Sequence, residues 1–257
     1  MKKFLRGAFG LLALGMAAPA VAADFPVAYS REPVMIPAWY DWSGLYLGLN
    51  GGWASSRNCW NDLSLTIGGP STGTEGCNNA KGALGGGQLG FRWQPNSSWV
   101  FGVEFQGDWA DLIGSNLSQN PAEPGLINRS RVGAFGFFTG QIGYTIDTVL
   151  LYAKGGGALA LDRYNGTLVG SPPISFDSIP GQVRYGAVAG AGLEFAFAPN
   201  WSLAFEYDHA FLGTRTEDFY STLVAGVFTR EDHIRQDMDI FTLRLNYRIN
   251  GPVIAKY

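Results

Sequence analysis

The stretch from Val183 to Leu212 reads VRYGAVAGAGLEFAFAPNWSLAFEYDHAFL, and its pattern decides the fold. Before Pro199-Asn200 every odd position is apolar or aromatic, whereas the even positions include Arg184 and Glu194 among glycines. After this turn the alternation resumes, with Glu206 on the polar face. A period of two predicts two β-strands joined by a tight turn. Strands this long, with charges and glycines opposite an apolar face, are typical of a transmembrane β-barrel.

The same alternation recurs along the chain and predicts eight strands. They lie at about residues 42–54, 81–94, 99–112, 131–146, 149–161, 183–198, 201–212 and 237–249. Long polar loops are expected at 55–80, 113–130, 163–182 and 213–236, and short turns at 95–98, 147–148 and 199–200. Long external loops alternating with short periplasmic turns are the asymmetry of an outer-membrane barrel. We therefore predict an all-β fold, an eight-stranded antiparallel transmembrane β-barrel with up-and-down topology.

The first residues carry an export signal. Residues 1–23 combine Lys2, Lys3 and Arg6 with an apolar run and a small-residue end, which predicts a secretory signal peptide. Residues 24–41 hold three prolines and no period, so we expect a periplasmic leader before a barrel domain at 42–257. The formal charge of −3 becomes more negative once the three basic residues are removed, which disfavours nucleic-acid binding.

High glycine content fits the same architecture. The chain has 36 glycines among 257 residues, roughly twice the average share of about 7%. Glycine is expected where strands bend sharply and where a narrow lumen must be filled by small groups.

Three segments carry a family resemblance. They read DWSGLYLGLNGG at 41–52, GQIGY at 140–144 followed by LLYAKGG at 150–156, and NYR at 246–248. These segments resemble the first strand, central hairpin and closing strand of small porin-like outer-membrane proteins of alphaproteobacteria, often called outer membrane immunogenic proteins. The resemblance implies an eight-stranded OmpA-type barrel in the outer membrane, inserted by the barrel-assembly machinery among lipid and lipopolysaccharide. It brings no catalytic residues.

The two cysteines of the chain, Cys59 and Cys77, both fall in the predicted loop at 55–80. In an exported protein such a pair is expected to form a disulfide, with two free thiols as the alternative. No Cys-x-x-Cys spacing is present, so the pair is expected to brace a loop and not to serve redox chemistry.

Charged residues also recur on the inward register of the strands. Glu206 and Arg244 fall on neighbouring strands at similar depth. Because buried charges persist only when they are paired, we expect a charged network inside the barrel. Its predicted members are Arg92, Glu104, Lys154, Glu206, Arg244 and Arg248.

Three classes of function compete. An enzyme is disfavoured because barrel hydrolases acting on lipid A place a Ser two residues after the catalytic His, whereas Phe211 and Arg235 stand two residues after His209 and His233. No metal or cofactor site is expected from the spacing of these histidines. A narrow pore or a barrel that binds a small ligand such as haem is the alternative. Since eight strands enclose a lumen that side chains can fill, a non-catalytic, surface-exposed structural barrel is favoured.

Overall fold

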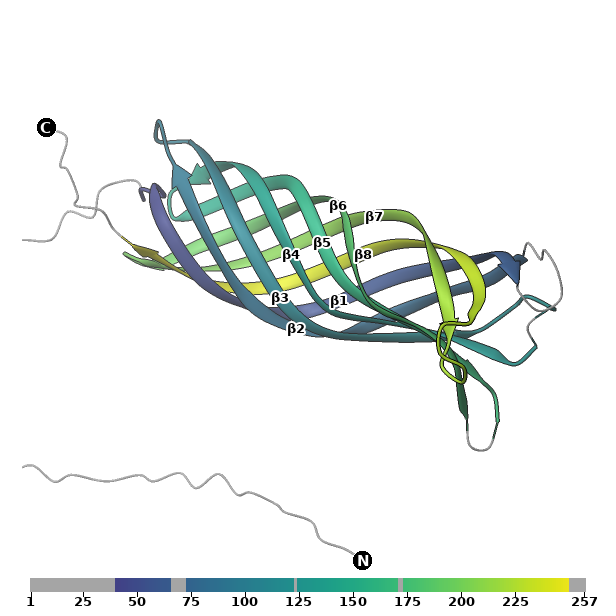
Figure 1. The fold of residues 1–257 in the computed structure, drawn as a ribbon. Helices are drawn as coiled ribbons and strands as arrows, with labels where there is room; N and C mark the ends of the chain where they lie inside the picture. The colour runs from purple at the N-terminus through teal and green to yellow at the C-terminus, as the bar shows by residue number, and fades with distance from the viewer. Residues whose placement is uncertain (1–39, 66–72, 123, 171–172, 250–257) are drawn as a thin grey trace, which may run out of the picture. The chain divides into compact units, whose positions relative to one another are not determined.

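The computed structural model describes residues 40–65, 73–122, 124–170 and 173–249, and its strands close into a single barrel (Figure 1). Each strand pairs in antiparallel fashion with its sequence neighbours, and β1 closes on β8. The strands are β1 (Gly44–Leu65), β2 (Gly73–Trp93), β3 (Trp99–Leu117), β4 (Leu126–Ile146), β5 (Val149–Leu168), β6 (Ile174–Ala198), β7 (Trp201–Ser221) and β8 (Phe228–Ile249). The predicted eight strands and three short turns are confirmed. The expected signal peptide and nearly all of the leader lie outside the described residues. Among the described residues, no helix has the length and apolarity needed to cross a bilayer.

The strands are longer than predicted, so the bounds of the four long loops were wrong. The β1–β2 ladder continues from Ser55 and Lys81 to Asp62 and Gly73, through most of the expected loop at 55–80. The ladders β3–β4, β5–β6 and β7–β8 continue in the same way. Beyond the membrane both faces of a strand can be polar, because one faces water and the other faces an interior that holds polar as well as apolar layers. The alternation that marks a strand in the sequence then disappears while the backbone pairing continues.

Strand register sets the stagger of the barrel. A path along paired residues that starts at Tyr46 returns to β1 at Ser56, ten residues further along the strand. Such a stagger requires the strands to tilt, by about 35–45° in typical barrels. Residues far apart in sequence therefore reach one level of the lumen.

The outer wall carries an apolar band beside the three short turns. We call this side the turn end of the barrel and the opposite side the far end. Aromatic side chains edge the band, as in outer-membrane barrels. Those near the turn end include Trp93, Trp99, Tyr144 and Trp201, and those toward the far end include Trp53, Trp109 and Phe211, all of them exposed. These exposed aromatic side chains form two girdles, one at each edge of the apolar band.

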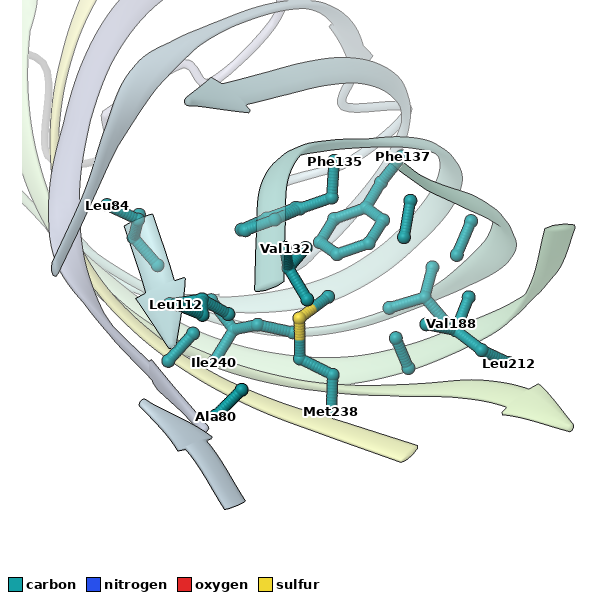
Figure 2. Packing of buried hydrophobic residues seen from close by; sticks show 14 residues of the cluster. Ala80, Leu84, Leu112, Val132, Phe135, Phe137, Val188, Leu212, Met238 and Ile240 are labelled. Carbon is teal, nitrogen blue, oxygen red and sulfur yellow. The ribbon is translucent and has the colours of Figure 1, made fainter. Parts of the chain in front are cut away.

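The lumen is filled in layers, which the buried side chains of β8 show in order. From the far end to the turn end they are Thr229, Arg230, Asp232, Ile234, Gln236, Met238, Ile240, Thr242, Arg244 and Asn246. An apolar layer thus separates two polar ones. This layer, the apolar belt, gathers residues of all eight strands, and Figure 2 shows how its side chains pack. Its members are Ala54, Ala80, Leu84, Leu112, Val132, Phe135, Phe137, Ala158, Ala160, Val188, Ala210, Leu212, Met238 and Ile240.

Candidate functional site

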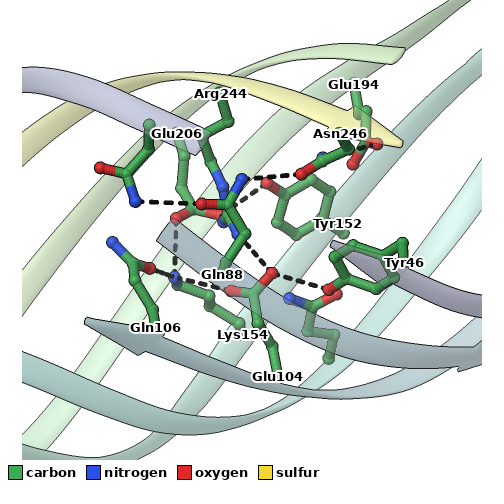
Figure 3. A network of polar contacts seen from close by, with 12 residues as sticks. Tyr46, Gln88, Glu104, Gln106, Tyr152, Lys154, Glu194, Glu206, Arg244 and Asn246 are labelled. Carbon is green, nitrogen blue, oxygen red and sulfur yellow. Dashed lines mark hydrogen bonds and ion pairs between the residues drawn. The ribbon is translucent and has the colours of Figure 1, made fainter. Parts of the chain in front are cut away.

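A cluster of five charged residues lies in the lumen on the turn-end side of the apolar belt. Figure 3 shows four of them, Glu104, Lys154, Glu206 and Arg244, with their polar neighbours. This proximal ion cluster consists of Glu104, Lys154, Glu206, Asp208 and Arg244, on strands β3, β5, β7 and β8. Lys154 Nζ lies 2.7 Å from Glu206 Oε1, 3.1 Å from Asp208 Oδ2 and 3.6 Å from Glu104 Oε1. The Arg244 guanidinium bridges the carboxylates of Glu104 and Glu206. Every cation in the cluster is therefore neutralised by carboxylates from other strands.

Two tyrosine hydroxyls add hydrogen bonds to the glutamates of the cluster. The Tyr46 hydroxyl donates to Glu104 Oε2 at 2.6 Å, and the Tyr152 hydroxyl donates to Glu206 Oε2 at 2.5 Å. The Tyr46 ring passes over Gly90, where an added Cβ would lie 2.4 Å from ring atoms. The Tyr152 ring passes over Gly192 with the same clearance. Glycine on the facing strand therefore leaves the space in which each ring lies.

A second ion pair lies next to the proximal ion cluster, nearer the turn end. Arg92 Nη2 lies 2.8 Å from Glu194 Oε2, and both side chains are buried. Glu194 also accepts hydrogen bonds from Ser202 and from Asn246 Nδ2. The Arg92 guanidinium stacks on the Tyr46 ring at 4.3 Å. Through Ser202 and Asn246 the pair links β2, β6, β7 and β8 on the turn-end side of the proximal ion cluster.

The structure brings together five of the six residues predicted for the charged network, within these two adjoining layers. Arg248 is the exception, because its Nη2 donates to the Pro199 carbonyl at 2.8 Å and its guanidinium stacks on Tyr40 at the barrel mouth. The prediction omitted Asp208 and Glu194. Both lie on the inward register of the stretch that identifies the fold, and this register is the signal that could have placed them in the network.

Another charged cluster, absent from the sequence prediction, lies at the far end. This distal ion cluster consists of Glu75, Asp177, Arg230 and Asp232, with Asn128. Arg230 Nη1 lies 2.8 Å from Glu75 Oε2 and 3.2 Å from Asp232 Oδ2, and Arg230 Nε lies 3.0 Å from Asp177 Oδ2. Burial, with the neighbouring carboxylates of Glu75, Asp62 and Asp177, raises the pKa of Asp232 to about 8, although Arg230 opposes the shift. Carboxylates here exceed the charge of one guanidinium, so a proton on Asp232 relieves their repulsion.

Between the distal ion cluster and the apolar belt lies an aromatic layer. It contains Trp60, Tyr164, Ile179, Phe219 and Ile234. Arg184 lies on the turn-end side of this layer. Its Nε is 3.6 Å from Asp162 Oδ2, and its Nη1 donates to the Ile234 carbonyl at 2.8 Å. Polar and apolar layers thus alternate through the described length of the lumen.

One histidine has an acidic partner on the outer wall. His209 Nδ1 lies 2.7 Å from Asp239 Oδ1, which also accepts a hydrogen bond from the Tyr207 hydroxyl at 2.7 Å. Asp239 of β8 pairs with Ser55 of β1 on one side and with His209 of β7 on the other. The aspartate therefore lies between the serine and the histidine. A histidine can activate a serine only when it contacts the hydroxyl. Among the described residues, no serine or cysteine hydrogen-bonds to His209.

The cysteines lie directly opposite each other on β1 and β2 and form a disulfide. The bridge therefore joins two paired strands toward the far end, where the sequence had indicated a loop.

Comparison with known proteins places the chain in a family. The model of the outer membrane protein beta-barrel domain matches residues 9–248. The 31 kDa outer-membrane immunogenic proteins of Brucella melitensis and Brucella suis are each 29% identical over 216 residues, covering 79% of this chain and 85% of the relative. OprG, an outer membrane protein of Pseudomonas aeruginosa, shares the fold with a TM-score of 0.51 at 11% identity, covering 83% of this chain and 99% of OprG. The chain is an outer-membrane protein and belongs to the outer membrane β-barrel domain family.

Proposed function

We propose that this barrel is a non-catalytic structural and surface-exposed protein of the outer membrane whose lumen is closed by side chains. The observation that carries the proposal is the layered interior, in which the apolar belt lies between the proximal and distal ion clusters. Insertion by the barrel-assembly machinery and a setting among lipopolysaccharide belong to the same proposal. By the usual arrangement of such barrels, the turn end faces the periplasm and the far end faces outward.

The charges in the lumen argue against a steady pore. An ion-selective pore requires a continuous polar wall with charges of one sign. Here Lys154 and Arg244 are each bound by carboxylates, and the apolar belt interrupts the polar wall. Eight strands also enclose only enough space for side chains, whereas aqueous channels use about 16.

The outer wall argues against hydrolysis of a membrane lipid. The histidine at the edge of the apolar band, His209, contacts Asp239 and meets the Phe211 ring edge-to-face, with ring centroids 4.4 Å apart. A base oriented by an acid still needs a nucleophile on its other side. The absence of a hydroxyl or thiol bonded to His209 within the described ranges supports a non-catalytic role.

Surface exposure is supported by the length of the strands. On β8 the outward apolar residues run from Phe241 to Ile249, whereas the strand begins at Phe228. The remaining residues therefore extend beyond the hydrocarbon region on the far side. A relative at 29% identity bears the name outer-membrane immunogenic protein, which is consistent with a part exposed at the cell surface.

Planar-bilayer conductance of the refolded protein tests the proposal. We expect little or no steady current, with a trimeric porin as the positive control and empty bilayer as the baseline. Incubation with lipid A should leave its mass spectrum unchanged. Stable single-channel steps that disappear in Arg244→Ala would show that the barrel is a pore and not closed. Loss of an acyl chain from lipid A would show that it is an enzyme.

A further inference from the structure

Three exposed arginines lie close together on the outer wall of β4 and β5. Arg129 and Arg131 lie on β4, and Arg163 lies on β5. All three are exposed, whereas the alternating residues Ser130 and Asp162 are buried in the lumen. Because successive side chains of a strand point to opposite faces, the three arginines project outward. We refer to them as the arginine patch.

The patch lies just beyond the apolar band. On β5 the outward residues Leu159 and Leu161 are exposed, and Arg163 is the next outward residue toward the far end. On neighbouring β3, Asp111 follows Trp109 of the far-end girdle in the same way. The arginines are therefore at the height where the hydrocarbon region gives way to the headgroups of the surrounding lipid.

The charges of the patch are only partly balanced by the protein. Arg131 and Arg163 stand directly opposite each other in the β4–β5 ladder, and Arg129 is the adjacent outward residue on β4. Like charges in this arrangement destabilise a sheet. Asp111 Oδ1 lies 2.9 Å from Arg131 Nη2 and accepts from its Nε at 3.0 Å. Across the described ranges, neither Arg129 nor Arg163 has a carboxylate partner.

We propose that the arginine patch binds the phosphate groups of lipopolysaccharide in the outer leaflet. Guanidinium groups bind phosphate through two parallel hydrogen bonds, and a phosphate between Arg131 and Arg163 would offset their repulsion. The phosphates of lipid A sit at the junction between acyl chains and headgroup, which is the height of the patch. The inference rests on the proposed orientation of the barrel but is independent of whether the lumen conducts.

Native mass spectrometry of the folded barrel in detergent tests the proposal. The titrants are lipid A carrying both phosphates, lipid A lacking them, and phosphatidylglycerol. We expect wild type to bind the diphosphorylated form at least about tenfold more tightly than either other lipid. Lipid A without phosphates loses the charge-assisted hydrogen bonds to the guanidinium groups, and phosphatidylglycerol, with a single phosphodiester charge, forms fewer of them. Equal binding of the three lipids would overturn the proposal, and so would tighter binding of phosphatidylglycerol. This measurement does not depend on orientation in the membrane, so its failure is separate from failure of the proposed topology.

Substitutions locate the site. The triple variant Arg129→Gln, Arg131→Gln, Arg163→Gln should lose the preference for phosphate, and Asp111→Asn should strengthen binding by freeing Arg131.

Arg163→Gln has a matched control in Arg235→Gln, since Arg235 is an exposed arginine on β8 whose Nε already lies 3.2 Å from Asp237 Oδ2. We expect weaker binding for Arg163→Gln and unchanged binding for Arg235→Gln. Equal losses in these two variants would overturn the assignment. The wild-type comparison of the three lipids decides the matter even if the triple variant does not fold.

Discussion

Arg230 on β8 and Glu75 on β2 form a buried ion pair, with Nη1 and Oε2 2.8 Å apart and both side chains inaccessible to solvent. The two residues are 155 positions apart in the chain. The same guanidinium contacts Asp177 of β6 and Asn128 of β4. One arginine therefore ties four strands together beyond the apolar band, where no surrounding hydrocarbon confines them.

Removing this arginine should weaken the barrel strongly. Arg230→Ala would leave the buried carboxylates of Glu75 and Asp177 without their cation, and loss of one partner of a buried pair costs about 3–5 kcal/mol. The free energy of unfolding in urea measures the effect. The control is Arg235→Ala, since Arg235 is exposed and its partner Asp237 is only half-buried, and ion pairs at the surface contribute about 0–1 kcal/mol. Similar small losses for both variants would mean that the distal ion cluster does not hold the strands.

Glu206 and Arg244 should be coupled in stability. Their side chains form an ion pair inside the proximal ion cluster, and contacting residues typically show interaction energies of about 0.5–3 kcal/mol. Glu206→Ala and Arg244→Ala should each lower the urea midpoint, and the double variant should lose less than the sum. Glu206→Ala with the exposed Arg235→Ala serves as the additive reference. Strict additivity of Glu206→Ala and Arg244→Ala would contradict the contact.

Reduction of the Cys59–Cys77 bridge should lower stability moderately. The bridge spans a sequence separation of 18 residues, for which restriction of the unfolded chain is worth about 3 kcal/mol. Urea unfolding with and without reductant measures the loss, and Cys59→Ser should remove the response to reductant. Intact mass should increase on alkylation only after reduction. Alkylation of the native protein without reductant would contradict the bridge.

Titration of Asp232 should lower the free energy of unfolding of the barrel as the pH rises. Its pKa is raised to about 8 in the folded barrel, whereas an unfolded Asp titrates near about 3.9. Between these values the folded state holds a proton that the unfolded state releases, so stability falls as pH increases from about 4 to about 8. Asp232→Asn should show a smaller fall in the urea midpoint between pH 5 and pH 8 than wild type, within this window. An identical fall in both proteins would locate the pH dependence elsewhere.

Protease treatment of intact cells should cut at the far end. The link between β7 and β8 exposes Leu223 and Val224, whereas the β2–β3 turn at residues 95–98 lies at the opposite end. We expect cleavage within 222–227 and none within 95–98, and permeabilised cells provide the control for access to the turns. Cleavage confined to 95–98 in intact cells would mean that the turn end, and not the far end, faces outward.

The sequence alone determined the membrane-spanning part of the fold. Apolar side chains must face lipid, so the alternation is preserved where the wall crosses the bilayer, as in the stretch from Val183 to Leu212. The number of strands, the short turns and the inward register of Glu206 and Arg244 all follow from that constraint. The distal ion cluster does not, because outside the membrane polar residues are allowed on both faces of a strand.

Tertiary structure decided which of the inward side chains meet. The ten-residue stagger around the barrel brings Glu104, Lys154, Glu206 and Arg244 to one level, and a pattern of period two carries no information about stagger. The same geometry leaves Arg248 at the mouth, although its register on β8 matches that of Arg244. It also places Arg230 beside Glu75, since closing the barrel converts separation along the chain into contact across the lumen. Local alternation specifies the face of each strand, and only the closed barrel specifies its neighbours.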